Sequence, residues 1–413
     1  MSAGRFSVMS RVAATVLIVV IVSFGVIVQQ SGTADALPVG VWSSPVQISS
    51  VELIRGDIDG NIVYEYGWSN LAVSDDGGAT WDPEMSYRGH LDASEGTVHR
   101  VDVRDVPVLG TIVFMKSTDH GTTWSSPVVI MQESGNDGGY RIAKFDTTII
   151  VYTFENAGTS YGLIKSSKSI DDGATWSSPV MVDPTVHCED PLASPMVYLN
   201  GIVYMTYYNY SYDDPVFSDI IVIKSSDLGT SWEDRTVVGS GYTPTIAADS
   251  GSIYVTYWDD SGSGLVLVKS TDGDTWSSPV VVGDMINGTD PQTFHSICAK
   301  GGAVFVAYIT YDNPGGIDEY WVHVNYSGDS GATWEDMGNV TGGDGDEMYP
   351  NVMFDGAKLH LTWIDAQGSG GWGGVTFYRS FTLNEPVPEF ATLLLPIVGT
   401  ALLVSGLVLA RRR

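Results

Sequence analysis

Aromatic and acidic side chains recur beside short apolar segments throughout this chain of 413 residues. Flat aromatic rings next to carboxylates can hold sugars, and carboxylate oxygens are ligands that Ca²⁺ accepts. We therefore take these side chains as candidate ligand-binding residues, with packing aromatics and turn acids as the alternative interpretation. Two further acids, Asp92 and Glu95, precede one of the apolar segments, and we expect them on the same face as the other candidates. The candidate set is Trp68, Tyr140, Arg141, Glu155, Tyr208, Trp258, Asp259, Asp312, Tyr349 and Asp365.

Other chemistries find little support in the sequence. The pairs His187-Cys188 and His295-x-x-Cys298 lie far apart, and their spacing does not form a zinc motif. The sequence therefore predicts no metal site and no cofactor, with Ca²⁺ left open, and it identifies no catalytic residue. The 49 acidic and 20 basic residues give a net charge of −29, which argues against nucleic-acid binding through a basic surface. Because 43% of the residues are hydrophobic, the chain can bury a large core.

One motif, Ser-x-Asp-x-Gly-x-Thr-Trp, recurs six times between residues 74 and 334, with small departures in the fourth and fifth copies. The copies start about 51 residues apart on average, which is the length of one four-stranded blade. Each copy lies between two extended segments, so the motif predicts a hairpin tip. Its glycine suits a positive φ, its aspartate and hydroxyls can bond the turn, and its tryptophan can pack beneath the hairpin. The motif residues are Asp76, Trp81, Asp119, Trp124, Asp171, Trp176, Asp227, Trp232, Asp272, Trp276, Asp329 and Trp334.

These motifs resemble the Asp-box repeats of sialidases and other bladed glycan-active proteins. The resemblance implies a structural role for the boxes, on the face opposite the active site. It also implies three arginines for a substrate carboxylate, a Tyr-Glu nucleophile pair and an Asp acid/base. This chain departs from that pattern, because the Phe-Arg-Ile-Pro signature is absent and Tyr140-Arg141-Ile142-Ala143 is only a faint echo. A complete arginine triad is not evident: Arg235 and Arg379 look structural, and the others considered are Arg55, Arg88, Arg100 and Arg141, all within the first three repeats.

A second set of repeated segments alternates as blade strands should. Examples run from Val203 to Tyr207 and from Ile253 to Tyr257. A strand of the kind that precedes each box appears once more without a box, from Val375 to Phe381, and the segment from Trp42 to Val46 looks like the part that follows a box. We therefore expect an all-β fold, a single β-propeller over residues 37–384 made of four-stranded blades. Seven blades are favoured, six are the alternative, and the N-terminal strand should complete the last blade.

Apolar runs flank this domain and predict a hydrophobic helix at each end. Residues 1–36 read as a signal peptide or a signal anchor, and residues 385–413 as a transmembrane helix with a basic tail. Pro388-Glu389-Phe390 and the terminal arginines resemble the archaeal Pro-Glu-Phe sorting signal, which implies processing by an archaeosortase. We expect an exported protein anchored at the extracellular face of the cell membrane. Its candidate glycosylation sequons begin at Asn209, Asn287, Asn325 and Asn339.

The favoured function is a cell-surface propeller that binds a glycan, an envelope polymer or a protein partner through the face opposite the boxes. The alternative is an exo-acting glycoside hydrolase, sialidase-like, or a lyase that uses carboxylates on the same face. A purely structural envelope component is a third option. Two carboxyl groups in one site with converging arginines would favour the enzyme.

Overall fold

The computed structural model describes residues 19–22, 25–28, 40–67, 69–104, 110–132, 139–156, 162–186, 196–211, 214–233, 235–249, 251–283, 295–312, 319–341, 347–366 and 374–383. Every regular element among these residues is a β-strand. The chain divides into two compact units, residues 1–35 and 36–413.

The first unit contains a two-stranded hairpin, in which β1 (Val19–Val22) pairs antiparallel with β2 (Gly25–Val28). A helix is predicted through this run, and the structure differs because valine and isoleucine, which are β-branched, favour extended backbone. The predicted C-terminal helix and the Pro-Glu-Phe motif lie outside the described residues. Within the described ranges, no helix has the length and apolar character needed to cross a membrane.

Three four-stranded antiparallel sheets begin the second unit, each with its strands in sequence order. The first sheet contains β5 (Leu53–Asp59), β6 (Ile62–Gly67), β7 (Asn70–Ser74) and β8 (Met85–Ser86). The second contains β9 (His90–Ser94), β10 (Thr97–Arg104), β11 (Thr111–Ser117) and β12 (Val128–Gln132). The third contains β13 (Tyr140–Phe145), β14 (Thr148–Asn156), β15 (Gly162–Ser169) and β16 (Val180–Val186).

One long strand, β20 (Thr236–Asp249), is shared by the next two sets of strands. Its first part pairs with β19 and its second part with β21, so it ends one sheet and begins another. The strands before it are β17 (Met196–Leu199), β18 (Ile202–Ser211) and β19 (Asp214–Ser225). Those after it are β21 (Ser252–Asp259), β22 (Gly264–Ser270) and β23 (Val280–Gly283). A further sheet contains β24 (Ser296–Lys300), β25 (Ala303–Asp312), β26 (Glu319–Ser327) and β27 (Glu335–Asn339).

The last sheet combines both ends of the domain. β28 (Glu347–Phe354), β29 (Lys358–Asp365) and β30 (Val375–Leu383) are completed by β3 (Gly40–Trp42) and β4 (Val46–Ser49), which both pair with β30. Gly40 is opposite Leu383 and Trp42 is opposite Phe381. The prediction that the N-terminal strand completes the last sheet is therefore confirmed.

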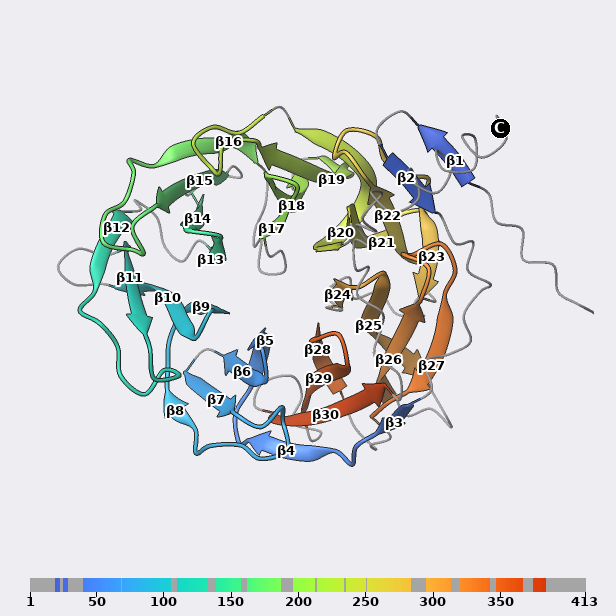
Figure 1. Cartoon of the computed structure of the whole chain (residues 1–413), viewed down its shortest axis with the longest axis horizontal. Coiled ribbons are helices and arrows are strands. Elements are labelled where there is room, and N and C mark those ends of the chain that lie inside the picture. The colour runs from blue at the N-terminus through green and yellow to red at the C-terminus, as the bar shows by residue number, and fades with distance from the viewer. Residues whose placement is uncertain are drawn as a thin grey trace, which may run out of the picture. The chain divides into compact units, whose positions relative to one another are not determined.

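The sheets of the second unit form a ring, with the first strand of each sheet innermost (Figure 1). The innermost strands β5, β9, β13, β17, the second part of β20, β24 and β28 are neighbours in this order, and β28 lies beside β5. The ring is therefore closed. The predicted all-β propeller is confirmed in this respect.

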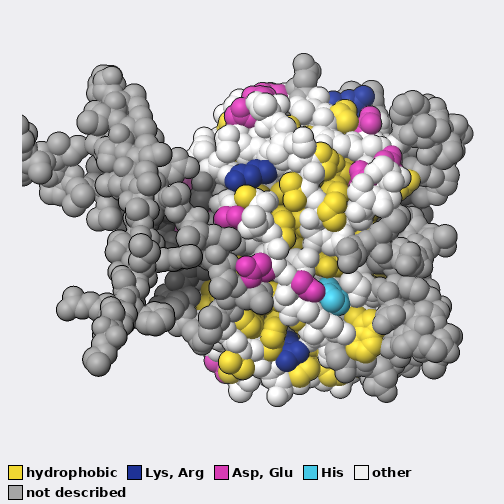
Figure 2. All heavy atoms as spheres, turned by 90° about the vertical axis from the view of Figure 1, so that its right-hand side faces the viewer, with side chains coloured by type: hydrophobic (Ala, Val, Ile, Leu, Met, Phe, Trp, Pro, Cys, Tyr) yellow, Lys and Arg dark blue, Asp and Glu magenta, His cyan; other side chains and the backbone are white. Residues whose placement is uncertain are grey.

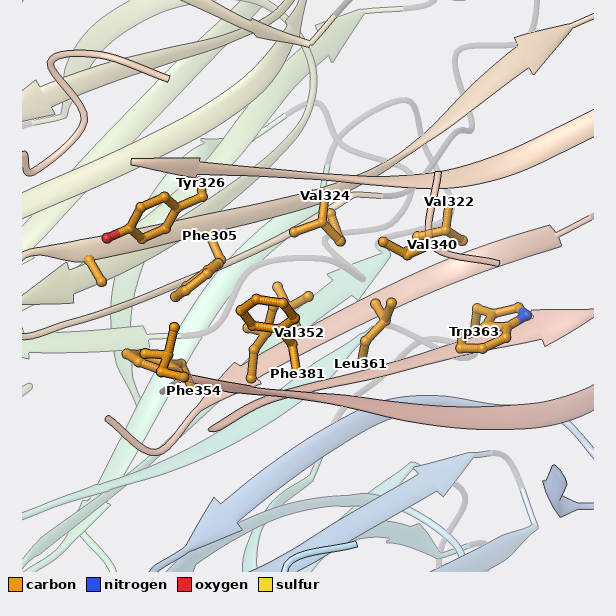
Figure 3. Packing of buried hydrophobic residues seen from close by; sticks show 14 of the residues in the cluster. Phe305, Val322, Val324, Tyr326, Val340, Val352, Phe354, Leu361, Trp363 and Phe381 are labelled. Atoms are coloured by element: carbon orange, nitrogen blue, oxygen red, sulfur yellow. The ribbon is translucent and has the colours of Figure 1, made fainter. Parts of the chain in front are cut away.

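Apolar side chains between neighbouring sheets form the core. In Figure 3, Phe305 and Val324 from one sheet face Phe354, Leu361 and Phe381 from the next. The rings of Phe305 and Phe354 have centroids 4.9 Å apart. The outer side of the ring is mixed, since Figure 2 shows acidic, basic and apolar side chains interspersed on the side that faces the viewer.

The Asp-boxes are hairpin tips, as the sequence predicts. In the second box, Thr123 donates its backbone N–H and its hydroxyl to Asp119 at 2.8 and 2.6 Å, and the Gly121 N–H donates to Ser117 Oγ at 2.8 Å. The Thr123 hydroxyl and N–H hold the pKa of Asp119 at about 2. The tryptophan packs against the preceding sheet, as Trp176 does on Phe114 with ring centroids 5.3 Å apart. The box therefore joins two sheets.

Lysines reinforce the same end of the ring. Each of several sheets places a lysine against the box of the following sheet: Lys224 Nζ lies 2.6 Å from Asp274 Oδ1, and Lys269 Nζ donates to Ser330 O at 2.9 Å. Across the closure, Lys358 Nζ donates to Gly77 O at 2.9 Å. These lysines stabilise contacts between sheets at the box end.

Candidate functional site

Strand direction decides which end of the ring carries each candidate residue. Every box follows the third strand of its sheet, so the start of each first strand and the end of each second strand lie at the opposite end. Trp258 and Asp259 end β21 and Asp365 ends β29, while Tyr140 and Arg141 begin β13. The last part of β18 contains Tyr208, the first part of β28 contains Tyr349, and Glu155 and Asp312 lie at strand ends with side chains outside the described set. Trp68 also lies outside it.

Not all of these side chains are available as a binding surface. Trp258 is only 8% exposed and its ring meets those of His295 and Tyr308 edge-on. Tyr208 packs against two core clusters. Asp259 accepts the Ser261 N–H at 3.2 Å and so holds its own turn. Glu95, expected with Asp92 at the face opposite the boxes, lies in the hairpin between β9 and β10 at the box end.

Three consecutive first strands bring a histidine and two arginines together. Arg141 Nη1 lies 3.0 Å from His90 Nε2, and Arg55 Nη1 lies 3.4 Å from His90 Nδ1. Burial, followed by the charges of Arg141 and Arg55, lowers the pKa of His90 well below its usual value. The imidazole is therefore neutral and can accept a hydrogen bond from a guanidinium.

Two tyrosines surround the same imidazole. Tyr140 meets the His90 ring edge-on with centroids 5.0 Å apart, and Tyr66 does so at 6.0 Å. Burial raises the pKa of Tyr66 to about 12, so its hydroxyl stays protonated at neutral pH. We call Arg55, His90, Tyr140 and Arg141 the arginine–histidine cluster. It places the buried guanidinium of Arg141 and the half-buried side chain of Arg55 next to aromatic rings.

A pair of carboxyl groups lies two residues further along the same strands. Asp57 follows Arg55 in β5 and Asp92 follows His90 in β9, so each lies on the same side of its strand about 7 Å away. Asp57 Oδ2 accepts the Ala93 N–H at 2.7 Å, and Asp92 Oδ2 accepts the Lys144 N–H at 3.1 Å. Each carboxyl thus bridges to the next innermost strand.

Burial sets the charge of this carboxyl pair. It raises the pKa of Asp57 to about 8, with Asp92 as the second cause, and it raises the pKa of Asp92 to about 6. Burial and the interaction between the two groups favour the protonated forms, so the pair resists carrying two negative charges. The combination can provide one acid and one base.

Sequence reasoning singled out only part of this arrangement. It placed Arg141 and Tyr140 at the end of the ring opposite the boxes, where they lie, and it retained Arg55 among the arginines. It missed His90 and Asp57. The available signal was the alternation Arg55-x-Asp57 and His90-x-Asp92 at the start of two equivalent strands. Arg379 has the structural role expected of it, since its Nε donates to Ser43 O at 2.6 Å.

Metal-ligating side chains do not gather in the described ranges. Among those residues, no group of three or more His, Cys, Asp or Glu side chains could hold a metal ion. His295 is buried with its Nε2 2.9 Å from Thr256 Oγ1, and His187 and Cys188 lie outside the described residues.

The sequons differ in their surroundings. Asn339 is exposed at the end of β27, and its Oδ1 accepts the Thr341 N–H at 3.0 Å. Asn325 is half-buried and its Nδ2 donates to Val282 O. Asn209 is half-buried in β18, and Asn287 lies outside the described residues.

Comparison with known proteins gives relatives in sequence and in structure. No family model matches the chain. Xyloglucanase Xgh74A of Acetivibrio thermocellus is 25% identical over 259 residues, which is 56% of this chain and 29% of that protein. This chain thus spans less than a third of the length of the curated relative it matches.

Solved structures resemble the chain at low identity. YCF48 bound to D1 peptide has a TM-score of 0.50 at 15% identity, covering 84% of this chain and 98% of that one, which shows likeness of fold alone. A Trypanosoma rangeli sialidase mutant displaying trans-sialidase activity has a TM-score of 0.45 at 15% identity, covering 70% and 53%. The α-L-arabinofuranosidase Arb93A from Fusarium graminearum has a TM-score of 0.45 at 15% identity, covering 70% and 91%.

Proposed function

We propose that this chain acts on a glycan at the end of the ring opposite the boxes, and that it hydrolyses a glycosidic bond there. The observation that carries the proposal is the two-layer arrangement of the arginine–histidine cluster above the carboxyl pair. The sequence similarity to a xyloglucanase supports a carbohydrate substrate. Hydrolysis was the alternative at the level of sequence, and the paired carboxyl groups now favour it.

The carboxyl pair would divide the chemistry between an acid and a base. Asp57, with its pKa near 8, would donate a proton to the leaving glycosidic oxygen. Asp92, with its pKa near 6, would be ionised and would act as nucleophile or activate a water. Arg55 and Arg141 would orient the substrate two residues above, through the forked donors that fit carboxylates and hydroxyls.

A turnover assay on the full chain tests this proposal. Aryl glycosides of different sugars and xyloglucan oligosaccharides would be offered to the wild-type protein and to Asp57→Asn and Asp92→Asn. We expect each change to lower kcat about 100-fold or more. Asp59→Asn is the matched control, because Asp59 lies two residues beyond Asp57 on the same strand and also accepts a backbone N–H from the next sheet, that of Gly96 at 2.6 Å. Equal activity in all three variants would refute the assignment.

Binding without hydrolysis is the second candidate. The observation in its favour is that both carboxyl groups accept backbone N–H bonds from the adjacent sheet, which is also what structural acids do. If the protein only binds, we expect it to bind glycans on an array and Arg141→Gln to weaken this binding. We also expect the wild-type protein to cleave no glycoside. Turnover by the wild-type protein would exclude this candidate.

We further propose that the ring has seven blades, with β20 divided between two of them. The protein would be exported and held at the outer face of the cell membrane, supported by its apolar terminal runs and the Pro-Glu-Phe motif. Cell fractionation combined with mass spectrometry of the two mature ends tests both export and processing. Recovery of the whole chain from the cytoplasmic fraction would contradict the proposal.

A further inference from the structure

A second group of arginines surrounds a single buried carboxylate in β10. The side chain of Asp102 is 1% exposed, and three guanidinium groups approach it. Arg104 Nε lies 2.9 Å and Arg100 Nη2 3.2 Å from Asp102 Oδ2, while Arg88 Nε lies 3.6 Å from Oδ1. One carboxylate offsets one positive charge, so two positive charges remain in this group.

The three arginines differ in what else they contact. Arg100 is buried, and its guanidinium lies over the rings of Tyr87 at 4.7 Å and Trp124 at 5.2 Å. Arg88 and Arg104 have side chains that are 57% and 44% exposed. Arg100 thus anchors Asp102 inside the protein, and Asp102 in turn fixes the two exposed guanidinium groups.

This group lies at the same end of the ring as the arginine–histidine cluster. Arg88 comes just before β9, whose first residue His90 pairs with Val101, and Arg104 ends β10. Tyr140 connects the two groups, because its ring meets His90 at 5.0 Å while Asp102 and Arg88 are among the charges acting on its hydroxyl. The two groups are therefore neighbours across one tyrosine.

The arginines of the domain are concentrated at the end of the ring opposite the boxes. Between residues 37 and 384 the chain has seven arginines, and five of them belong to these two groups. The lysines that contact boxes lie at the other end of the ring. Five of the seven arginines are thus gathered at one end of a domain from a chain with a net charge of −29, and two of them, Arg88 and Arg104, are exposed.

We propose that Arg88 and Arg104 form a second anion subsite and that the glycan is a polyanion whose acidic groups recur along its chain. One acidic group would bind Arg55 and Arg141, and another would bind Arg88 and Arg104 across Tyr140. The inference rests on the proposed function for the placement of the glycan. Carboxylate and sulfate groups share the chemistry that a forked guanidinium recognises.

Affinity measurements on the full chain test the subsite. The probes are polygalacturonate, dextran sulfate and neutral dextran, which separate carboxylate from sulfate and both from an uncharged polymer. We expect a polyanion to bind and dextran not to bind, with Arg88→Gln/Arg104→Gln weakening the polyanion about tenfold or more. The control Arg235→Gln/Lys300→Gln removes the same charge elsewhere and should change affinity less than about twofold. Equal losses in both double variants would overturn the subsite, as would equal binding of neutral dextran.

Two further variants keep the result decisive. Arg88→Gln alone leaves Arg100 and Arg104 beside Asp102, so it retains the fold if the double variant does not, and a loss of about threefold supports the subsite. Unchanged affinity in this folded single variant refutes a role for Arg88. Arg88→Lys/Arg104→Lys keeps the charge but not the forked donors, and a loss of affinity there shows that guanidinium geometry matters.

The failure of this inference and that of the proposed hydrolysis are distinguishable. Cleavage of a glycan that depends on Asp57 but not on Arg88 or Arg104 would overturn the subsite and leave hydrolysis intact. Polyanion binding that depends on Arg88 and Arg104, without turnover of any glycoside, would support the subsite and refute hydrolysis.

Discussion

Arg141 Nη1 lies 3.0 Å from His90 Nε2, and the bond crosses from one innermost strand to the next. A guanidinium has no acceptor, so the imidazole must offer a lone pair. Arg55 Nη1 lies 3.4 Å from Nδ1 and 3.5 Å from Nε2 of the same ring. His90 is therefore the common neighbour of two arginines that would otherwise repel each other, and this predicts how the cluster responds to mutation.

Replacing His90 tests the need for an acceptor between the arginines. His90→Phe keeps an aromatic ring but removes one acceptor of the buried Arg141 Nη1, which also donates to Tyr140 O at 2.7 Å, so we expect the free energy of unfolding to fall by about 1–3 kcal/mol. His90→Gln supplies an oxygen acceptor and should lose less. Urea unfolding followed by tryptophan fluorescence measures both. Equal stability of the two variants would show that the bond contributes nothing.

The pH dependence of stability tests the state of Asp57. Its pKa is about 8 in the folded protein against a usual value of 3.8, so the folded state holds the proton more tightly than the unfolded state. Its contribution to stability is fully present below about pH 4 and is lost as the pH rises towards about 8. Asp57→Asn cannot ionise, so its stability relative to wild type should increase across this range. Thermal unfolding at pH 4 to 9 gives the difference, and a difference independent of pH would contradict the raised pKa.

Box glycines test how closely neighbouring sheets approach. Gly173 has φ of 82°, and a Cβ there would lie 1.9 Å from Phe114 in the preceding sheet. Gly201 has φ of 89° but nothing within 4 Å of a Cβ, so it is the control for backbone strain alone. We expect Gly201→Ala to cost about 1 kcal/mol and Gly173→Ala about 3 kcal/mol. Chemical denaturation measures both, and similar costs would mean that Phe114 moves aside freely.

A disulfide can test the closure of the ring. Val41 and Thr382 are register partners on β3 and β30, and both side chains are exposed. Val41→Cys/Thr382→Cys should form a disulfide under mild oxidation and raise the melting temperature, because it constrains a very long loop in the unfolded chain. Each single cysteine variant is the control. A melting temperature that is identical with and without reductant would indicate that the two strands separate before the rest of the ring unfolds.

The architecture could be predicted from the sequence because it rests on repeated local signals. Each box combines a glycine with positive φ, such as Gly121, and an aspartate such as Asp119 that bonds its own turn, so the hairpin is encoded within eight residues. The pairing of Trp42 with Phe381 could also be predicted, because both segments match parts of the repeat. The first apolar run is predicted as a helix but contains strands at Val19–Val22 and Gly25–Val28, since its β-branched residues also suit extended backbone.

The candidate site was harder to predict from the sequence because it depends on residues from different repeats. Aromatic residues at strand ends were reasonable candidates, yet Trp258 is buried by His295 and Tyr308, which no local pattern reveals. His90 gained its importance only when three strands placed it between Arg55 and Arg141. Arg104 was overlooked altogether, because its role depends on the buried carboxylate of Asp102.

The last sheet contains both the beginning and the end of the domain, and this has a consequence for biosynthesis. Among the described strands, β3 and β4 pair with β30 alone, and more than 300 residues separate them from it along the chain. Contacts so distant in sequence form slowly. In the nascent chain, β3 and β4 therefore stay unpaired and available to chaperones until translation of the domain is almost complete.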